Sequence, residues 1–220
     1  MKKATNIWVV IPAYNEARHL QRVIKKAKRH VANVLVVDDG SKDRTFDIAS
    51  KSADVLKHII NLGKGAALRT GCDYAISQGA KSIIVMDADG QHDPEEIPKF
   101  IKALDKYEVV FGYRRFNKDM PLLLKCGNWF LSTSIRLLYK IKLKDTQCGY
   151  RAFSAKAYKK IKWKSSDYSM ESEMIANVGK HHLKYAEIPI QTIYSDKYKG
   201  TTIVDGIKIV FNMLLWKIRR

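Results

Sequence analysis

The sequence contains few cysteines and no long uncharged apolar run. Its 3 cysteines are an odd number at wide spacings, which excludes a disulfide framework and a cysteine-based zinc site. A reducing, cytoplasmic compartment is the simpler expectation. No uncharged stretch reaches the roughly 18 residues of a membrane span, and the apolar run at 7–11 is too short for a signal peptide. We therefore expect a cytoplasmic protein without a membrane span.

Acidic residues are scarce relative to basic ones, with 22 Asp and Glu against 40 Lys and Arg, a net charge of +18. The excess is uneven: residues 1–112 carry 18 basic and 14 acidic residues, whereas residues 113–220 carry 22 and 8. Any single lysine is more often present only for solubility. The asymmetry as a whole predicts that the second half faces an anionic partner, either nucleic acid or a lipid surface.

The chain shows no repeat, low-complexity segment or linker. Its 220 residues, 46% of them apolar, suffice for one large domain or two small lobes. The only candidate boundary lies near Tyr113, where the composition turns basic. We expect a single domain over 1–220, divided into a first half (1–112) and a basic second half (113–220).

Strand-like and helix-like patterns alternate through the first half. Short apolar runs predict strands, and helical spacing of apolar residues predicts helices between them. The alternation implies βαβ units and an α/β fold with a mostly parallel sheet sandwiched by helices, similar to a Rossmann fold. The predicted strands are 7–11, 34–37, 55–60, 83–86 and 109–112, and the predicted helices are 20–31, 45–52, 63–76 and 97–104.

The second half is less regular. It predicts helices at 121–139, at about 170–178 and at 203–218, with strands at 150–153 and 183–190. The first and last helices are amphipathic. Such helices usually cover a core, but Trp129, Trp216 and many flanking lysines also suit a membrane interface. Both roles remain open for these two helices.

Two carboxylates follow the predicted strand at 83–86. Asp87 and Asp89 are one residue apart, and Gln91 comes two further on. A lone D-x-D pair arises about once by chance in such a chain, but here a strand ends before it and a helix begins after it, at Asp93-Pro94-Glu95-Glu96. Oxygen ligands at this spacing suit Mg²⁺ or Mn²⁺ bound together with substrate phosphates.

Polar residues also follow the first two strands, at 12–16 and at 38–39. Because parallel strands place their carboxyl ends on one edge of a sheet, these segments should meet in one crevice. Asp38 or Asp39 can accept hydrogen bonds from a base or a ribose, and Tyr14 offers a ring for stacking. Taken one by one, these residues also fit packing or turn roles.

In this order, the motifs resemble those of the family 2 glycosyltransferases, and within them the polyprenyl- and dolichyl-phosphate sugar synthases. The resemblance implies a GT-A fold and an inverting transfer from a nucleotide-sugar, GDP-mannose or a UDP-sugar, to a polyprenyl phosphate at the cytoplasmic face of a membrane. The matching segments are IPAYNE (11–16), VVDDGS (36–41), NLGKGAALRTG (61–71), MDADGQHDPEEIP (86–98), GYR (112–114), DTQCGYRAF (145–153) and EIPI (187–190).

The resemblance also implies roles for single residues. Asp89 and Arg114 would be catalytic, with Arg114 approaching the phosphates, and Asp87, Asp89 and Gln91 would hold the metal. The donor would contact Pro12, Tyr14, Glu16, Asp38, Asp39, Lys64, Asp87 and Ala88. The acceptor or its phosphate would contact Lys197, Lys199, Asp145, Arg151 and Glu173. Relatives often carry an arginine where this chain has Lys197-Tyr-Lys-Gly200, and a lysine lacks its bidentate fork.

The acceptor determines the mechanism. A phosphate monoester, with a second pKa of about 6, arrives ionised and needs no general base. A sugar hydroxyl of a glycolipid or polysaccharide would need one, and Glu171, Glu173 and Asp145 are the candidates.

Three other classes remain. A sugar-phosphate nucleotidyltransferase would have a glycine-rich loop where this chain has PAYNE. A nucleic-acid-binding module would explain the charge, but no recognition motif is present, so nucleic acid is not expected as a partner. A non-catalytic nucleotide-binding scaffold would not turn over nucleotide-sugars.

Overall fold

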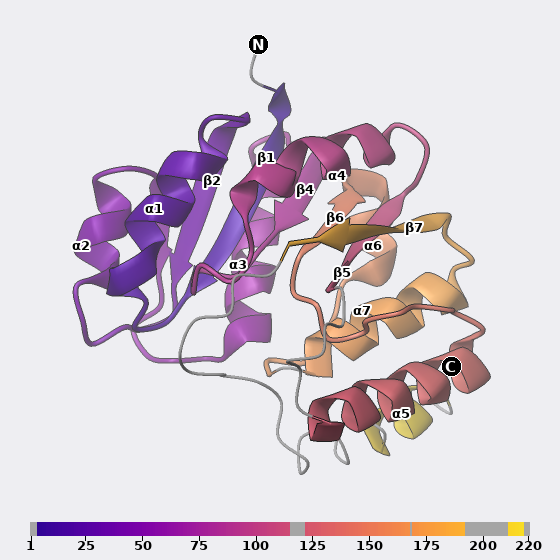
Figure 1. The fold of residues 1–220 in the computed structure, drawn as a ribbon. Helices are drawn as coiled ribbons and strands as arrows, with labels where there is room; N and C mark the ends of the chain where they lie inside the picture. Colours follow the sequence, from indigo (N-terminus) through magenta and orange to yellow (C-terminus); the bar gives the residue numbers. More distant parts are fainter. Residues whose placement is uncertain (1–3, 115–121, 168, 192–210, 218–220) are drawn as a thin grey trace.

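The computed structural model describes residues 4–114, 122–167, 169–191 and 211–217, with the backbone alone at 4–5 and 122–129. The first half alternates strands and helices, as its apolar periodicity predicts (Figure 1). In chain order the elements are β1 (Ala4–Ala13), α1 (Ala17–Ala27), β2 (Val31–Asp38), α2 (Thr45–Ser50), β3 (Asp54–Lys57), α3 (Lys64–Ser77), β4 (Ser82–Val85), η1 (Pro94–Glu96), α4 (Ile97–Leu104), β5 (Val109–Arg114), α5 (Leu122–Tyr139), β6 (Arg151–Ser154), α6 (Ala155–Ile161), α7 (Ser169–Lys180) and β7 (Tyr185–Ile190).

The described strands form one sheet of seven in the order β3-β2-β1-β4-β6-β5-β7. Neighbours pair in parallel except at β6, which runs antiparallel to both β4 and β5. The mostly parallel sheet is therefore confirmed. The strand expected at 150–153 corresponds to β6. It lies between β4 and β5 and runs antiparallel to both, whereas a simple βαβ succession would place β4 and β5 side by side.

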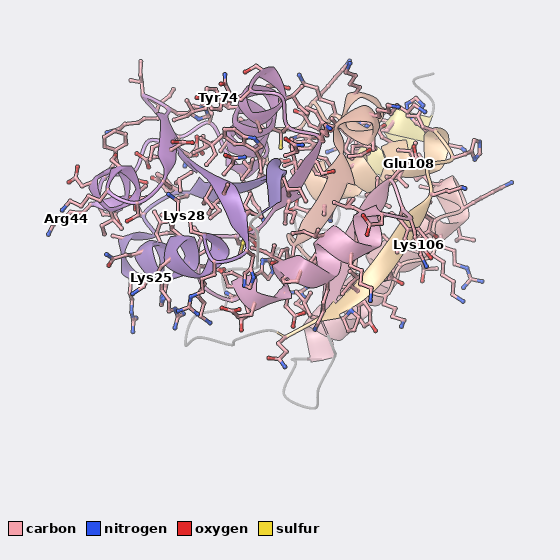
Figure 2. The ribbon with its side chains drawn as sticks, turned by 90° about the horizontal axis from the view of Figure 1, so that it is seen from above. Lys25, Lys28, Arg44, Tyr74, Lys106 and Glu108 are labelled. Carbon is pink, nitrogen blue, oxygen red and sulfur yellow. The ribbon has the colours of Figure 1, made fainter. Side chains whose placement is uncertain are left out.

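Alternate residues of each central strand enter two different cores. Val10 of β1 packs in a core with α3, α5, α6 and α7, whereas its neighbours Val9 and Ile11 pack in a core with α1, α2 and α4. This two-sided burial explains why the strands are continuous apolar runs in the sequence. Figure 2 shows the result from above, with Lys25 of α1 and Lys28 just after it on one side of the sheet and Tyr74 of α3 on the other.

The prediction of a strand at 55–60 is wrong at its end. β3 stops at Lys57, and Ile59 is 98% exposed. The partner strand β2 ends at Asp38, which pairs with Lys57, so β3 has no further strand to pair with. The His58 ring contacts Asp39 Oδ1 at 2.7 Å and Thr70 Oγ1 at 3.0 Å.

The helix predicted at 121–139 is confirmed as α5, and 211–217 of the predicted last helix is helical, while 203–210 lies outside the described residues. The two helices lie side by side (Figure 1), and the Tyr139 hydroxyl donates to Met213 O at 2.7 Å. Ile135 and Met213 are buried in the core, so both helices cover it. In the described part of the chain, no helix is long and apolar enough to cross a membrane.

Candidate functional site

The loops that follow β1, β2 and β4 meet at the carboxyl edge of the sheet. The β1 and β2 loops are tied together: Asp39 N donates to Ala13 O at 2.8 Å, and Asn15 N donates to Ser41 Oγ at 2.9 Å. The predicted convergence is therefore confirmed, and it creates a pocket of about 530 Å³. The pocket is lined by Pro12, Ala13, Tyr14, Asn15, Glu16, Asp39, Asn61, Gly63, Lys64, Ala67, Asp87, Ala88, Asp89, Gln91, His92, Arg114, Gln147, Cys148, Gly149, Asp167 and Glu171.

The two aspartates after β2 differ in their surroundings. Asp39 lines the pocket, and its carboxylate accepts from His58, from Leu62 N at 3.0 Å and from Gly63 N at 2.8 Å. Asp38 is fully buried behind it. Asp38 Oδ1 accepts from Ser41 N, whereas Oδ2 has no hydrogen-bond partner among the described residues. Such an orphaned buried acceptor costs stability unless a ligand or water satisfies it.

The loop after β4 is shaped by its own backbone. Gly90 adopts φ +76°, a conformation that favours glycine, and Asp89 Oδ1 accepts from Gln91 N at 2.9 Å. The N-cap expected at Asp93 is confirmed, since its carboxylate accepts from Glu95 N at 3.2 Å at the start of η1. The loop therefore holds both aspartates of the D-x-D pair at the pocket wall.

Asp87 and Asp89 experience opposite electrostatic surroundings. Burial would raise the pKa of Asp87, but the nearby Lys64 ammonium lowers it below its usual value. Burial, together with the charge of Asp87, raises the pKa of Asp89. Among the residues that the structure describes, no three His, Cys, Asp or Glu side chains group as metal ligands. The two carboxylates and the Gln91 amide are nevertheless oxygen donors of the kind that Mg²⁺ and Mn²⁺ take.

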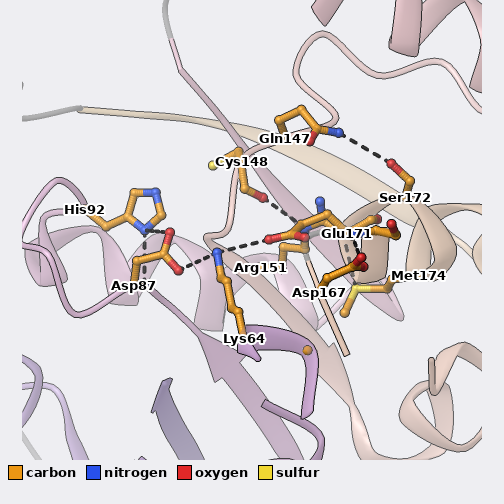
Figure 3. Close-up of polar contacts among 12 residues, drawn as sticks. Lys64, Asp87, His92, Gln147, Cys148, Arg151, Asp167, Glu171, Ser172 and Met174 are labelled. Carbon is orange, nitrogen blue, oxygen red and sulfur yellow. Dashed lines mark hydrogen bonds and ion pairs between the residues drawn. The ribbon is translucent and has the colours of Figure 1, made fainter. Parts of the chain in front are cut away.

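Lys64 bridges the two halves of the chain inside the pocket (Figure 3). Its ammonium lies 2.7 Å from Asp87 Oδ1 and 3.0 Å from Glu171 Oε1. Burial alone would lower the pKa of Lys64, but the attraction of both carboxylates raises it above its usual value, so this lysine stays charged. Glu171 Oε2 is buried without a hydrogen-bond partner in the described part of the chain.

Arg114, the last residue of β5, reaches the pocket while held from behind by Asp145. Its Nε donates to Asp145 Oδ2 at 2.7 Å and its Nη2 donates to Oδ1 at 3.1 Å. A bidentate pair of this kind fixes the plane of the guanidinium. The Asp145 carboxylate is buried, so it positions Arg114 and does not face an acceptor.

The expectation that Arg151 contacts an acceptor phosphate is corrected by its surroundings. Its guanidinium is buried and donates to three backbone carbonyls, Cys148 O, Glu171 O and Thr146 O, at 2.6–2.9 Å. Such contacts fasten the loop before β6 to the start of α7.

Glu173 is corrected in the same way. Its carboxylate accepts from the backbone nitrogens of Lys164 and Ser165 and from the Ser165 hydroxyl, at 2.6–3.0 Å. The side chain is therefore occupied by the loop before α7. The two lysines expected at the acceptor, Lys197 and Lys199, lie outside the described residues.

The pocket also contains residues that the sequence did not single out, among them His92, Asn61 and Gln147. The His92 ring accepts from Asp87 N at 3.3 Å and stacks on Tyr150. Burial lowers the pKa of His92, so its imidazole is neutral at pH 7. His92 lies within the same strand-end segment as Asp87, and that position was the only signal in the sequence.

Together these features define an α/β fold with a polar pocket at the carboxyl edge of a mostly parallel sheet. Residues 8–162 match the family described as glycosyl transferase family 2. The chain belongs to this family and is a glycosyltransferase.

Two curated relatives indicate the range of activities that similar chains carry. A UDP-N-acetylglucosamine–dolichyl-phosphate N-acetylglucosaminyltransferase of Methanococcus voltae is 35% identical, over 96% of this chain and 96% of that protein. A polyprenol monophosphomannose synthase of Mycolicibacterium smegmatis is 28% identical, over 96% of this chain and 86% of the other.

A solved structure agrees in fold. Glucosyl-3-phosphoglycerate synthase from Mycobacterium tuberculosis, crystallised with Mg²⁺ and uridine diphosphate, superposes with a TM-score of 0.77. The sequence identity is 20%, and the alignment covers 96% of this chain and 79% of that one. At this identity the comparison concerns the fold alone.

Proposed function

We propose that this glycosyltransferase moves a sugar from a nucleotide-sugar to a polyprenyl phosphate at a membrane surface, with inversion and with the help of Mg²⁺ or Mn²⁺. The observation that carries the proposal is the grouping of Asp87, Asp89 and Arg114 on one pocket, with Arg114 oriented by Asp145. The names of the curated relatives, which transfer sugars to dolichyl or polyprenol phosphates, support the acceptor class.

The nucleoside part of the donor would bind where the β1 and β2 loops meet. Tyr14 is 41% exposed at this end of the pocket, and its ring can cover a base. Asp39 offers acceptors for base or ribose donors, whereas Asp38 lies behind it, fully buried and outside the pocket lining. Pro12 and Glu16 belong to the same wall. Both GDP-mannose and UDP-sugars contain suitable donor groups, and a panel of nucleotide-sugars distinguishes them.

The diphosphate would lie between the D-x-D loop and Arg114. Asp87, Asp89 and Gln91 would hold the divalent cation, which would neutralise charge growing on the departing diphosphate. Arg114 would add a second positive charge, already oriented by Asp145 before the donor arrives. Preorganised charge of this kind favours the transition state because no reorganisation is needed during the reaction.

The acceptor phosphate needs no proton removed, since its second pKa is about 6. Two of the three carboxylates that could serve a hydroxyl acceptor are occupied: Asp145 by Arg114, and Glu173 by the backbone at 164–165. A phosphate oxygen attacking the anomeric carbon opposite the leaving diphosphate would form the new C–O bond as the old one breaks. One displacement of this kind inverts the configuration.

A hydroxyl acceptor is the second candidate, and one observation favours it. Glu171 lines the pocket, and its Oε2 has no hydrogen-bond partner among the described residues. A carboxylate so placed could accept the proton of a sugar hydroxyl. In that case Glu171 would be a general base, and its loss would cost roughly 10²–10⁴-fold in rate.

The deciding experiment is kcat/KM against pH for wild type, Glu171→Gln and Asp145→Asn. With a phosphate acceptor, the acid limb follows the acceptor's own ionisation near pH 6 and persists in both variants. With a hydroxyl acceptor, Glu171→Gln abolishes turnover and the limb disappears with it. Beforehand, a panel of nucleotide-sugars with Mn²⁺, with and without polyprenyl phosphate, identifies the product.

The same proposal places the protein peripherally on an anionic membrane, at its cytoplasmic face. Leu137 on α5 and Phe211 on the neighbouring helix are 76% and 61% exposed, and the second half carries most of the positive charge. Exposed apolar side chains beside basic ones are typical of helices that lie in a membrane interface.

A further inference from the structure

Lys64 makes the most unusual contact in the pocket, because it pairs with a residue of the proposed metal site. Its ammonium lies 2.7 Å from Asp87 Oδ1, within hydrogen-bonding distance of an oxygen that would otherwise be available to a cation. Asp89, in contrast, accepts a hydrogen bond from Gln91 N. The D-x-D pair is thus asymmetric, with one carboxylate neutralised by the protein itself.

The position of Lys64 is set by the second half of the chain. Lys64 is the first residue of α3, and Gly65 behind it is clamped: Gly65 N donates to Ser166 O at 2.7 Å, and Trp163 Nε1 donates to Gly65 O at 2.8 Å. Glu171 then holds the ammonium from the far side at 3.0 Å. This clamp leaves the side chain directed at Asp87.

The contact between Lys64 and Asp87 also depends on the absence of a side chain at Gly149. A Cβ at Gly149 would lie 2.6 Å from Asp87 Oδ2 and 3.0 Å from Lys64 Nζ, so a side chain there would push the pair apart. Figure 3 shows the result, in which Lys64 lies between Asp87 and Glu171. Lys64 and Asp87 are both half-buried, and Lys64 has a second, buried carboxylate partner in Glu171, so the contact differs from an isolated, fully exposed surface pair, which contributes little.

We infer that Lys64 is an internal counter-cation that competes with the divalent metal for Asp87 and makes metal binding depend on the nucleotide. The inference rests on the metal-dependent function proposed above. A metal ion arriving alone meets a carboxylate that is already neutralised. A nucleotide diphosphate would bring oxygen ligands and negative charge, which would attract the ammonium away from Asp87 and leave that carboxylate available to hold the ion. Lys64 is thus a positioning residue that favours binding of metal and donor together.

The effect of the Lys64 charge on the affinity of Asp87 for a metal ion has an expected size. An opposite charge at this distance shifts proton binding to a carboxylate by roughly one to three powers of ten, and metal binding to the same oxygen should respond in the same direction. Removing the ammonium should therefore tighten the binding of Mn²⁺ alone by about tenfold or more. Once nucleotide has drawn Lys64 away from Asp87, the lysine no longer competes, so Mn²⁺ affinity with nucleotide should not change in the variant. The gain in Mn²⁺ affinity caused by nucleotide should therefore shrink by the same factor, and by linkage so should the gain in nucleotide affinity caused by Mn²⁺.

The test measures Mn²⁺ dissociation constants from the resonance signal of free Mn²⁺, with and without UDP or GDP. The variants are Lys64→Met and the double variant Lys64→Met/Glu171→Gln, which restores the net charge of the pocket and removes one carboxylate left without its cation. Lys162→Met is the matched control. Lys162 pairs with Asp73, which lies on the same helix as Lys64, α3, and neither residue of this pair lines the pocket. Thermal melting verifies that each variant is folded.

We expect both Lys64 variants to bind Mn²⁺ alone about tenfold more tightly than wild type, and the control to match wild type. Equal affinities in wild type and both variants would overturn the inference, and so would a gain in the single variant that vanishes in the double one, since net charge would then explain it. Either of these overturning results leaves the proposed metal-dependent function standing, provided that wild type still binds Mn²⁺ in the presence of nucleotide. Full transfer by wild type in excess chelator would instead refute the metal mechanism.

Discussion

Charged residues around the pocket are of two kinds: those that line it, which include Arg114 and Glu171 of the second half, and those that are buried behind it. In the first half, the carboxylates of Asp39, Asp87 and Asp89 follow strand ends and line the pocket. In the second half, Asp145 and Arg151 are buried and bind other parts of the protein. Both sets belong to motifs shared with family 2 glycosyltransferases. The first set faces the proposed ligands, whereas the second holds the surrounding loops in place.

A charged residue in a family motif is therefore not necessarily a ligand contact. Parallel strand ends expose their side chains at one edge, so polar residues there face the pocket. The second half is attached through an antiparallel strand and long loops, and its backbone carbonyl and amide groups need partners when buried. Buried side chains such as Arg151 and Glu173 supply those partners.

The largest effect on activity is expected from removing a pocket-lining carboxylate of the first half. Asp89→Asn keeps the shape of the side chain but removes its charge, so sugar transfer should fall by roughly 10³-fold or more, as for loss of a preorganised electrostatic group. The melting temperature should change little, because Asp89 makes one hydrogen bond of the loop. Initial rates and thermal melts measure the two effects. Asp93→Asn, at the cap of η1, is the control, and full activity in Asp89→Asn would contradict the metal mechanism.

The opposite pattern is expected in the second half. Arg151→Met leaves three buried carbonyl groups without their donor, and each buried acceptor left unsatisfied costs about 1–3 kcal/mol. Burial lowers the pKa of Arg151, yet an arginine stays charged at neutral pH. Urea unfolding should show this loss. A stable variant that has lost its activity would instead return Arg151 to the acceptor site.

Membrane binding should depend on the second half alone. Leu137→Ser should weaken binding to acidic vesicles by roughly tenfold, the value of one apolar side chain removed from water. Ile59→Ser, at a residue of the first half that is even more exposed than Leu137, should leave binding unchanged. Co-sedimentation at rising salt adds a second readout, since exposed charges are screened over about 10 Å at 0.1 M. Equal binding to neutral vesicles at high salt would contradict the prediction.

The smallest effect concerns the contact between α5 and the helix at 211–217. Burial raises the pKa of Tyr139 to about 12, above its value of about 10 in an unfolded chain. Because the folded pKa is the higher one, the contribution of Tyr139 to stability is complete below pH 10 and is lost as pH rises through 12.

Tyr139→Phe should cost about 1 kcal/mol at neutral pH, one hydrogen bond to Met213 O. The difference in stability between wild type and the variant should disappear toward pH 12. Chemical unfolding at several pH values measures it, with Tyr107→Phe, at a 39% exposed tyrosine, as the control. A difference that grows with pH would show that the sign is wrong.

The sequence alone predicts the fold class, most element positions and the strand-end segments that line the pocket from the first half. These follow from local patterns, because apolar periodicity reports burial and parallel strands place their ends together. It also determined the family, through motifs such as the one from Asp87 to Gln91. These are the features that depend on residues close together in the chain.

Only the tertiary structure decided which charged residues reach the pocket and which are consumed inside the protein. Arg151 donates to Glu171 O and Lys64 meets Asp87, contacts that span 20 and 23 positions and involve three separate elements. Contacts between distant segments also set the direction of β6, the end of β3 and the position of Lys64. The physical reason is that hydrogen bonds and ion pairs are set by distance in space, whereas periodicity in the sequence records only whether a side chain faces the core or the solvent.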